Sequence, residues 1–359
     1  MLAYGQIFHA GFCNFHLAMG LSLWALALLW RATLGGSLAA IPLLLLAATA
    51  HALPVAMALA AAGYVQLARK TPERRQPVLL AGTLALLLLL SLVLRAQFET
   101  YWAPQQAIGM TGADQVWLFG PKYFIVAAAL FFLWSALFLW RTPGPLFSIP
   151  LQLYLLAAAL VVLIPVRVFI PGFGHALVYI SDRMSLAAAV AACLTVGTAR
   201  PFWIEKAGLL LLAGLFFTFL YADTGALNRI EDQMAEAVRQ VPPGSRVVHA
   251  LAAPTGRLDP LTHMLERVCI GRCFSYANYE PSTAQFRVRA APDNGIVLAD
   301  YGDVFALRSG AYVVRERDVP LFQIDLCDEK TLTLCARTLR VGQPSGRKLL
   351  QAVPGLLGR

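Results

Sequence analysis

Charged side chains are scarce in this chain, and their scarcity excludes an ordinary soluble protein. Only 14% of the 359 residues are Asp, Glu, Lys or Arg, whereas 58% are hydrophobic. Soluble proteins carry about 25% charged residues. No Asp or Glu occurs before Glu73, and no Lys or Arg occurs before Arg31. The composition therefore predicts a polytopic helical membrane protein.

The sequence also lacks the motifs that mark common enzyme and nucleic-acid sites. It has no Walker loop, no dinucleotide-binding glycine fingerprint, no G-x-S-x-G and no H-E-x-x-H, which position phosphates, nucleophiles or zinc. The net charge is +9, but no basic stripe with interleaved aromatic residues is present, so we predict no nucleic-acid partner. A cleavable signal peptide is not expected, because the N-terminal region lacks Lys and Arg.

One basic loop and the apolar run after it define the expected topology. Residues 69–75 hold four cations and one anion, and no charged side chain occurs from Val78 to Leu94. About 18 such residues span a bilayer core as a helix, and the positive-inside rule keeps the basic loop cytoplasmic.

We expect seven or eight spans. The stretch 37–68 is either one long helix or, as we favour because of Pro54, two short helices broken near His51. The remaining spans are expected at 15–30, 121–141, 146–164, 184–198 and 207–221.

The last third of the chain has the composition of a soluble domain. Residues 1–222 carry twelve Lys or Arg and five Asp or Glu, whereas 223–359 carry seventeen and fifteen. We therefore expect a transmembrane bundle over 1–222, an extracytoplasmic α/β domain over 223–345 and a flexible tail over 346–359. Counting spans places that domain in the periplasm, with the bundle in a bacterial inner membrane. Helices are expected at 228–240 and 260–268, and strands at 246–251, 285–289, 295–299, 311–314, 321–326 and 332–338.

Four of the six cysteines lie in this domain: Cys269, Cys273, Cys327 and Cys335. Disulfides form in oxidising compartments, so we expect bridges here. Free thiols and a structural zinc site are the alternatives, although these spacings are not a standard zinc pattern. Four cysteines allow three pairings, and the sequence does not choose between them.

Two groups of side chains could carry chemistry. His9, Cys13 and His16 would share one face of a helix and could ligate a metal. Without a carboxylate or a fourth ligand this signal is weak, so we favour packing or hydrogen bonding inside the bundle. We predict no cofactor and leave a divalent metal open. The second group is expected in the external loops, where ionisable groups at membrane depth tend to be functional. It comprises Glu99, Asp114, Lys122, Arg167, His175, Asp182 and Arg183.

Three segments resemble bacterial GT-C-type glycosyltransferases. Residues 11–17 read Gly-Phe-Cys-Asn-Phe-His-Leu, similar to the segment that opens a middle helix of that family. Residues 48–54 resemble its next helix hairpin, and residues 181–184 resemble a late helix entry. The segment 241–247 and the strands after it resemble the family's periplasmic domain.

The resemblance implies transfer of a sugar from a polyprenyl-phosphate carrier to an acceptor outside the membrane. Lys122, Arg167 and Arg183 would then contact the phosphate, and Glu99 or Asp114 would act as acid or base. Family members carry a catalytic acid in the first external loop, which has no counterpart here. We therefore expect a chain that matches the family's second half: a truncated sequence, a fragment completed by a partner subunit, or a non-catalytic relative.

The alternative is a non-enzymatic membrane protein whose periplasmic domain binds a partner or assembles an envelope complex. A transporter is disfavoured, because the spans carry almost no charge and no pair of broken helices repeats in two halves.

Overall fold

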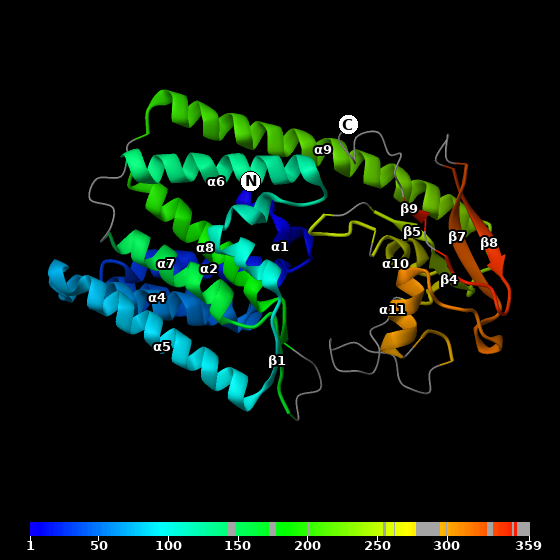
Figure 1. Cartoon of the computed structure of the whole chain (residues 1–359), viewed down its shortest axis with the longest axis horizontal. Coiled ribbons are helices and arrows are strands. Elements are labelled where there is room, and N and C mark those ends of the chain that lie inside the picture. The colour runs from blue at the N-terminus through cyan, green and yellow to red at the C-terminus, as the bar shows by residue number, and fades with distance from the viewer. Residues whose placement is uncertain are drawn as a thin grey trace. The chain divides into compact units, whose positions relative to one another are not determined.

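The computed structural model contains mainly helices, followed by a small α/β region (Figure 1). It describes residues 1–141, 148–171, 177–199, 201–253, 256–261, 263–277, 295–298, 300–328, 333–346 and 348–349. The chain divides into two compact units. Unit 1 comprises Met1–Trp117, Val126–Arg167 and Tyr179–Ala213, and unit 2 comprises Leu118–Ile125, Val168–Val178 and Gly214–Arg359.

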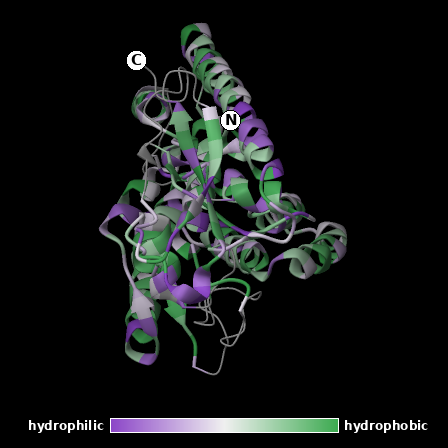
Figure 2. Cartoon of the chain, turned by 90° about the vertical axis from the view of Figure 1, so that its right-hand side faces the viewer, coloured by the Kyte–Doolittle hydropathy of each residue, from purple (hydrophilic) through white to green (hydrophobic). Residues whose placement is uncertain are grey.

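Among the described residues, five helices are long and apolar enough to cross a membrane. They are α4 (Ala52–Lys70), α5 (Gln76–Gln97), α6 (Pro121–Arg141), α8 (Ile180–Gly197) and α9 (Trp203–Arg239). Three shorter apolar helices accompany them: α2 (Cys13–Leu29), α3 (Leu34–Ala50) and α7 (Ile149–Leu163). Figure 2 shows hydrophobic residues spread over many of the helical ribbons. The chain is therefore a helical membrane protein.

The packing of unit 1 explains why these helices are apolar on nearly every side. Helices α2, α3, α4, α5, α7 and α8 contact one another in this unit. In α5 only Gln76 and Ser91 are fully buried. One side of the helix packs on the neighbouring core through Leu79, Leu80, Leu84 and Leu87, whereas Leu86, Leu88, Leu89 and Leu90 are exposed, as expected for side chains in contact with lipid.

Buried polar side chains join three of these helices. Tyr64 donates to Gln152 Oε1 at 2.6 Å, and Gln152 Nε2 donates to Gln76 Oε1 at 2.9 Å. This chain of hydrogen bonds satisfies groups that lipid could not, and it ties α4, α7 and the first turn of α5 together.

The predicted break in 37–68 is confirmed. Helix α3 ends at Ala50 and α4 begins at Ala52, with His51 in an extended conformation between them. Pro54 lies in the first turn of α4, where its missing N–H removes no helical hydrogen bond. His51 Nδ1 accepts from the Leu53 backbone N–H at 3.2 Å, so this histidine is a helix-end residue.

Two other helices differ from the expected bounds. Helix α8 begins at Ile180 instead of 184, because Tyr179 adopts a left-handed conformation and its carbonyl accepts the backbone N–H of Arg183 at 3.3 Å. Helix α9 joins the expected span 207–221 to the expected helix 228–240, so the predicted boundary at 222–223 lies inside one 37-residue helix.

Unit 2 contains a four-stranded sheet in the order β6-β4-β7-β8. The strands are β4 (Arg246–His249), β6 (Phe274–Ser275), β7 (Leu321–Asp328) and β8 (Thr333–Leu339), and only β8 runs antiparallel to its neighbour. A second pair joins β5 (Leu251–Ala252) to β9 (Lys348–Leu349). Residues of the C-terminal half of α9, including Ile230 and Met234, pack into the same core as β4, β7 and α10 (Met264–Cys269).

Several predictions in this region need correction. The strands predicted at 321–326 and 332–338 correspond to β7 and β8, but residues 295–298 form no strand and 311–314 contribute only an isolated bridge at Val313. Helix α11 (Tyr301–Ser309) was not predicted; Asp300 caps it by accepting the Asp303 N–H at 2.9 Å. The strand predicted at 285–289 and most of the tail predicted at 346–359 lie outside the described residues.

The structure pairs the four cysteines within short segments. Cys269 is bonded to Cys273, and Cys327 is bonded to Cys335. The first bridge closes the end of α10, and the second joins the facing strands β7 and β8. Cys13 and Cys193 are free and exposed.

A buried carboxylate organises the surface next to α11. Asp318 accepts hydrogen bonds from Tyr276 Oη at 2.6 Å, Tyr312 Oη at 2.8 Å and the backbone N–H of Arg315 at 2.7 Å. Asp318 is fully buried, so these donors replace the water that it loses.

This network predicts a loss of stability at alkaline pH. Burial and the hydrogen bond to Asp318 raise the pKa of Tyr312 to about 12, above the ordinary value near 10 for an unfolded chain. The neutral phenol is therefore the stabilised form. Its contribution is complete below about pH 10 and is lost as the pH rises through about 12. Absorbance of phenolate against pH should show a delayed class of tyrosines that Tyr312→Phe reduces. Titration of every tyrosine near pH 10 would contradict this expectation.

Candidate functional site

The first turn of α8 lies at the centre of the candidate site in unit 1. Two short helices from earlier in the chain contact α8: η3 (Pro104–Thr111) and η4 (Ala113–Val116). Gly112 joins them with φ of 70°, and a Cβ there would lie 2.3 Å from the backbone N of Ala189. Only glycine allows this approach, which brings Asp114 and Gln115 onto α8.

Asp114 is held inside this contact. The residue is 2% exposed, and its carboxylate accepts from Ser185 Oγ at 2.5 Å. Gln115 Nε2 donates to the same Ser185 oxygen at 3.1 Å. A buried carboxylate with this partner is poorly placed to reach a substrate hydroxyl, so we assign Asp114 to positioning α8.

Arg183 projects from the same turn of α8 onto two aromatic rings. Its Cζ lies 4.3 Å from the ring centroid of Phe12 and 5.8 Å from that of Phe15. Such cation–π contacts stabilise the guanidinium without supplying a hydrogen-bond acceptor for its N–H groups. Within the described residues no hydrogen bond from Arg183 to protein is found, and its Nε is buried without an acceptor.

The backbone next to Arg183 is strained. Tyr179, immediately before α8, has φ of 57° and ψ of 33°. For a residue other than glycine this conformation is unfavourable, and such residues cluster at functional sites. The Tyr179 ring lies 5.5 Å from that of Phe12, so the strained residue and Arg183 share one aromatic neighbour.

Glu99 and Arg167 lie on neighbouring segments of unit 1. Glu99 begins β1 (Glu99–Tyr101), and Arg167 begins β2 (Arg167–Phe169). The Val166 N–H donates to the Tyr101 carbonyl at 3.0 Å, and the Arg167 Cζ lies 5.8 Å from the Tyr101 ring centroid. Residues two apart in a strand share a face, so Glu99 and Tyr101 project to the same side. Glu99 is exposed.

Lys122 is placed differently from the expected phosphate-binding role. It lies in unit 2, where its Nζ is 2.6 Å from Oδ1 of Asp223, and Tyr123 Oη donates to Asp223 Oδ2 at 2.7 Å. Asp223 is fully buried. An ammonium neutralised by a buried carboxylate is a structural group, so we do not retain Lys122 among the phosphate ligands.

The helical face considered for a metal, His9 with Cys13 and His16, does not form. Helix α1 (Gln6–His9) ends at His9 and α2 begins at Cys13, separated by Gly11 with φ of 85°. His9 therefore does not share a helix with His16. No group of three His, Cys, Asp or Glu side chains that could hold a metal is found in the part of the chain that the structure describes.

The sequence predictions named the charges of the site but missed their partners. Asp182 accepts from Gln6 Nε2 at 3.4 Å, which brings the N-terminal segment to α8, and His175 lies outside the described residues. Phe12, Phe15, Ser185 and Asp223 were not predicted as partners. Only the apolar, aromatic start of the chain hinted that it belongs inside the bundle.

Comparison with family models, curated proteins and solved structures finds no match to this chain. The functional inference therefore depends on the geometry of the site and on the chemistry of its residues.

Proposed function

We propose that this chain is a GT-C-like membrane glycosyltransferase that takes a sugar from a polyprenyl-phosphate donor and passes it to an acceptor outside the cytoplasm. The observation that carries the proposal is Arg183, whose guanidinium lies over Phe12 and Phe15 at cation–π distance and has no protein acceptor among the described residues. A planar guanidinium with free in-plane donors suits a phosphate.

The position of Arg183 supports a lipid-linked phosphate in preference to a soluble one. It lies in the first turn of α8, a helix apolar enough to span a membrane. A phosphate bound there would lie at the level of the lipid headgroups, with its isoprenoid chain in the bilayer. Cationic side chains near helix ends commonly extend toward this level.

We assign the role of base to Glu99, because it is exposed at the start of β1 and Arg167 contacts Tyr101 of the same strand. The acceptor hydroxyl would lose its proton to the Glu99 carboxylate as its oxygen bonds to the anomeric carbon of the sugar. The bond from that carbon to the phosphate oxygen breaks, and polyprenyl phosphate leaves with the electron pair. Arg183 would stabilise the charge that develops on the leaving phosphate. Arg167, which stacks on Tyr101, would supply a second cation near Glu99.

Replacement of Arg183 by alanine tests the phosphate assignment. We expect Arg183→Ala to weaken polyprenyl-phosphate binding about 10- to 100-fold, because a charge-assisted hydrogen bond is lost. Arg183→Lys should recover part of the loss, since a lysine keeps the charge without the planar donor pair. The measurement is retention of polyprenyl phosphate by the purified chain in detergent.

Arg95→Ala provides the matched control. Arg95 lies in the last turn of α5 and also stacks on an aromatic ring, with its Cζ 3.9 Å from the Trp102 centroid. This variant should bind the lipid phosphate as the parent chain does. Equal affinity in Arg183→Ala and the parent would exclude Arg183 as the phosphate ligand.

A further inference from the structure

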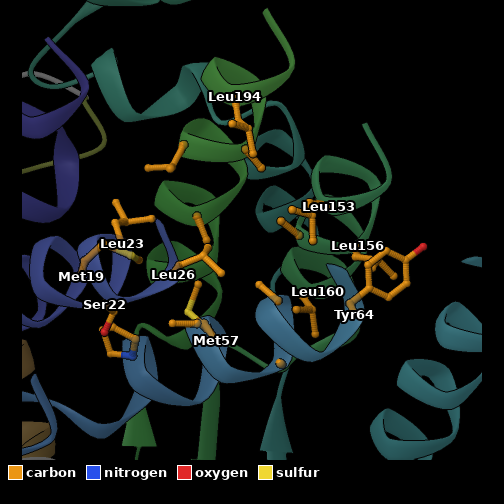
Figure 3. Close-up of a pocket in the computed structure, with 18 of the residues that line it drawn as sticks. Met19, Ser22, Leu23, Leu26, Met57, Tyr64, Leu153, Leu156, Leu160 and Leu194 are labelled. Atoms are coloured by element: carbon orange, nitrogen blue, oxygen red, sulfur yellow. The ribbon is translucent and has the colours of Figure 1, made fainter. Parts of the chain in front are cut away.

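Unit 1 contains an apolar cavity that the proposed transfer reaction does not use. Its volume is about 560 Å³, within the range of about 300–1,000 Å³ typical of small-molecule sites. Side chains of α2, α4, α5, α7 and α8 line it, and Figure 3 shows Leu23, Met57 and Leu160 among them.

The polar groups of the cavity wall differ in whether they have partners. Tyr64 donates to Gln152, and Thr83 donates to the Leu79 carbonyl at 2.9 Å. Ser22 Oγ is buried and has no hydrogen-bond partner, and the residue is only 1% exposed. A hydroxyl left without a partner in an apolar wall is costly and would gain one from a ligand carrying an ester or phosphate oxygen.

Only one charged residue lines the cavity among the described residues. Arg31 follows the end of α2 at one end of the wall, and it is exposed. No ion pair or hydrogen bond of its side chain is found in the described part of the chain. An apolar cavity with a single free guanidinium at its end is complementary to an amphiphile with an acidic head.

The Arg31 end of α2 is held firmly by α4. Gln66 Nε2 donates to the Leu29 carbonyl at 2.9 Å, and Arg69 donates to the Trp30 carbonyl. The Arg69 Cζ also lies 5.2 Å from the Trp30 ring centroid. These contacts fix Trp30, and with it the position of Arg31, against the C-terminal end of α4.

The charged end of the cavity is opposite to the site around Arg183. Phe15, which contacts Arg183, lies near the start of α2, and Arg31 lies 16 residues further along the chain. At 1.5 Å per residue the two ends are about 24 Å apart. Arg183 does not line the cavity, so the donor phosphate proposed above and the ligand of this cavity occupy opposite faces of the membrane.

We propose that this cavity binds one acidic phospholipid from the leaflet that meets the Arg31 end. An acyl chain would fill the apolar interior, with the phosphate at Arg31 and a glycerol-ester oxygen within reach of Ser22. This lipid is distinct from the sugar donor, and its site does not depend on the proposed transfer reaction.

Native mass spectrometry of the full chain in detergent tests the proposal. The probes are phosphatidylglycerol and phosphatidylcholine with identical acyl chains, added to the parent chain and to three variants. We expect one phosphatidylglycerol to be retained about fivefold better than phosphatidylcholine, the effect expected of one arginine near an acidic lipid. Arg31→Gln should abolish that preference, and Ala61→Phe, which fills the cavity wall, should remove both lipids.

Arg75→Gln is the matched control, because Arg75 belongs to the basic loop 69–75 but does not line the cavity. It should leave the preference unchanged. Equal retention of the two lipids by the parent chain, or an unchanged preference in Arg31→Gln, would overturn the proposal. Displacement of phosphatidylglycerol by polyprenyl phosphate would also overturn it. Arg31 is exposed, so its variant decides the matter even if Ala61→Phe fails to fold.

Discussion

Replacing Asp223 with alanine is expected to lower the free energy of unfolding by about 3–5 kcal/mol, because it leaves a largely buried ammonium without its partner. Lys122 is only 15% exposed and Asp223 is fully buried, with 2.6 Å between the charged atoms. Tyr123 would lose its acceptor at the same time. The loss combines an uncompensated charge with an unsatisfied hydroxyl.

The position of Lys122 explains why it depends on Asp223. Lys122 is the second residue of α6, where the positive end of the helix dipole disfavours a cation. Asp223 from α9 offsets the charge of the ammonium and the positive end of the α6 dipole. The rings of Tyr123 and Phe216, whose centroids are 6.1 Å apart, pack beside this pair. The ion pair therefore joins the beginning of α6 to α9 within unit 2.

Two further variants separate the loss of the pair from a general sensitivity of α9. Asp232→Ala removes an exposed acid from the same helix and should change stability by no more than about 0.5 kcal/mol. Lys122→Met combined with Asp223→Leu should recover the part of the stability that the unpaired charge costs, because an apolar pair removes that charge, whereas the Tyr123 hydroxyl still lacks its acceptor. The free energy of unfolding is measured by equilibrium denaturant titration of the purified chain in detergent. Similar losses in Asp223→Ala and Asp232→Ala would contradict this account.

Replacing Glu99 with glutamine should reduce sugar transfer by about 10²- to 10⁴-fold, the usual contribution of a general base. The amide keeps the size of the side chain but cannot accept the acceptor's proton. Binding of polyprenyl phosphate should be unchanged, since Arg183 makes that contact. The measurement is the transfer of labelled sugar from the polyprenyl-phosphate donor by membranes containing the chain.

Glu73→Gln is the control for this experiment. Glu73 is also exposed, but it belongs to the basic loop at the opposite end of α5 from Glu99. Its variant should transfer sugar at the parental rate, and Glu99→Asp should keep part of the activity. A parental rate in Glu99→Gln would remove Glu99 from the mechanism.

The helical part of the fold was predictable where a local signal defined it. The break at His51 follows from Pro54, and α6 begins and ends where Pro121 and Arg141 predicted. The continuity of α9 was not predictable, because Asp223 reads as the end of a span. Its charge is neutralised by Lys122, 101 residues away in the sequence, and no local pattern reports such a contact.

In the candidate site, too, the features with a local signal were predictable and those that depend on distant contacts were not. Arg183 could be selected as a cation at the expected start of a span, but its contact with Phe12 joins two segments 171 residues apart in the chain. Asp114 reads as a loop acid, and only the packing of η4 on α8 buries it against Ser185. The sequence shows which residues are charged and whether they fall in an expected span or loop. Tertiary packing decides which of these charges remain available to a ligand.

The most direct test of the proposed function compares the binding of polyprenyl phosphate with that of the uncharged polyprenol of the same length. The purified chain is titrated with each lipid in detergent, and retention is followed by native mass spectrometry. We predict that the parent chain prefers the phosphate and that Arg183→Ala loses this preference. Equal binding of the phosphate and the alcohol by the parent chain would contradict a lipid-phosphate site at Arg183.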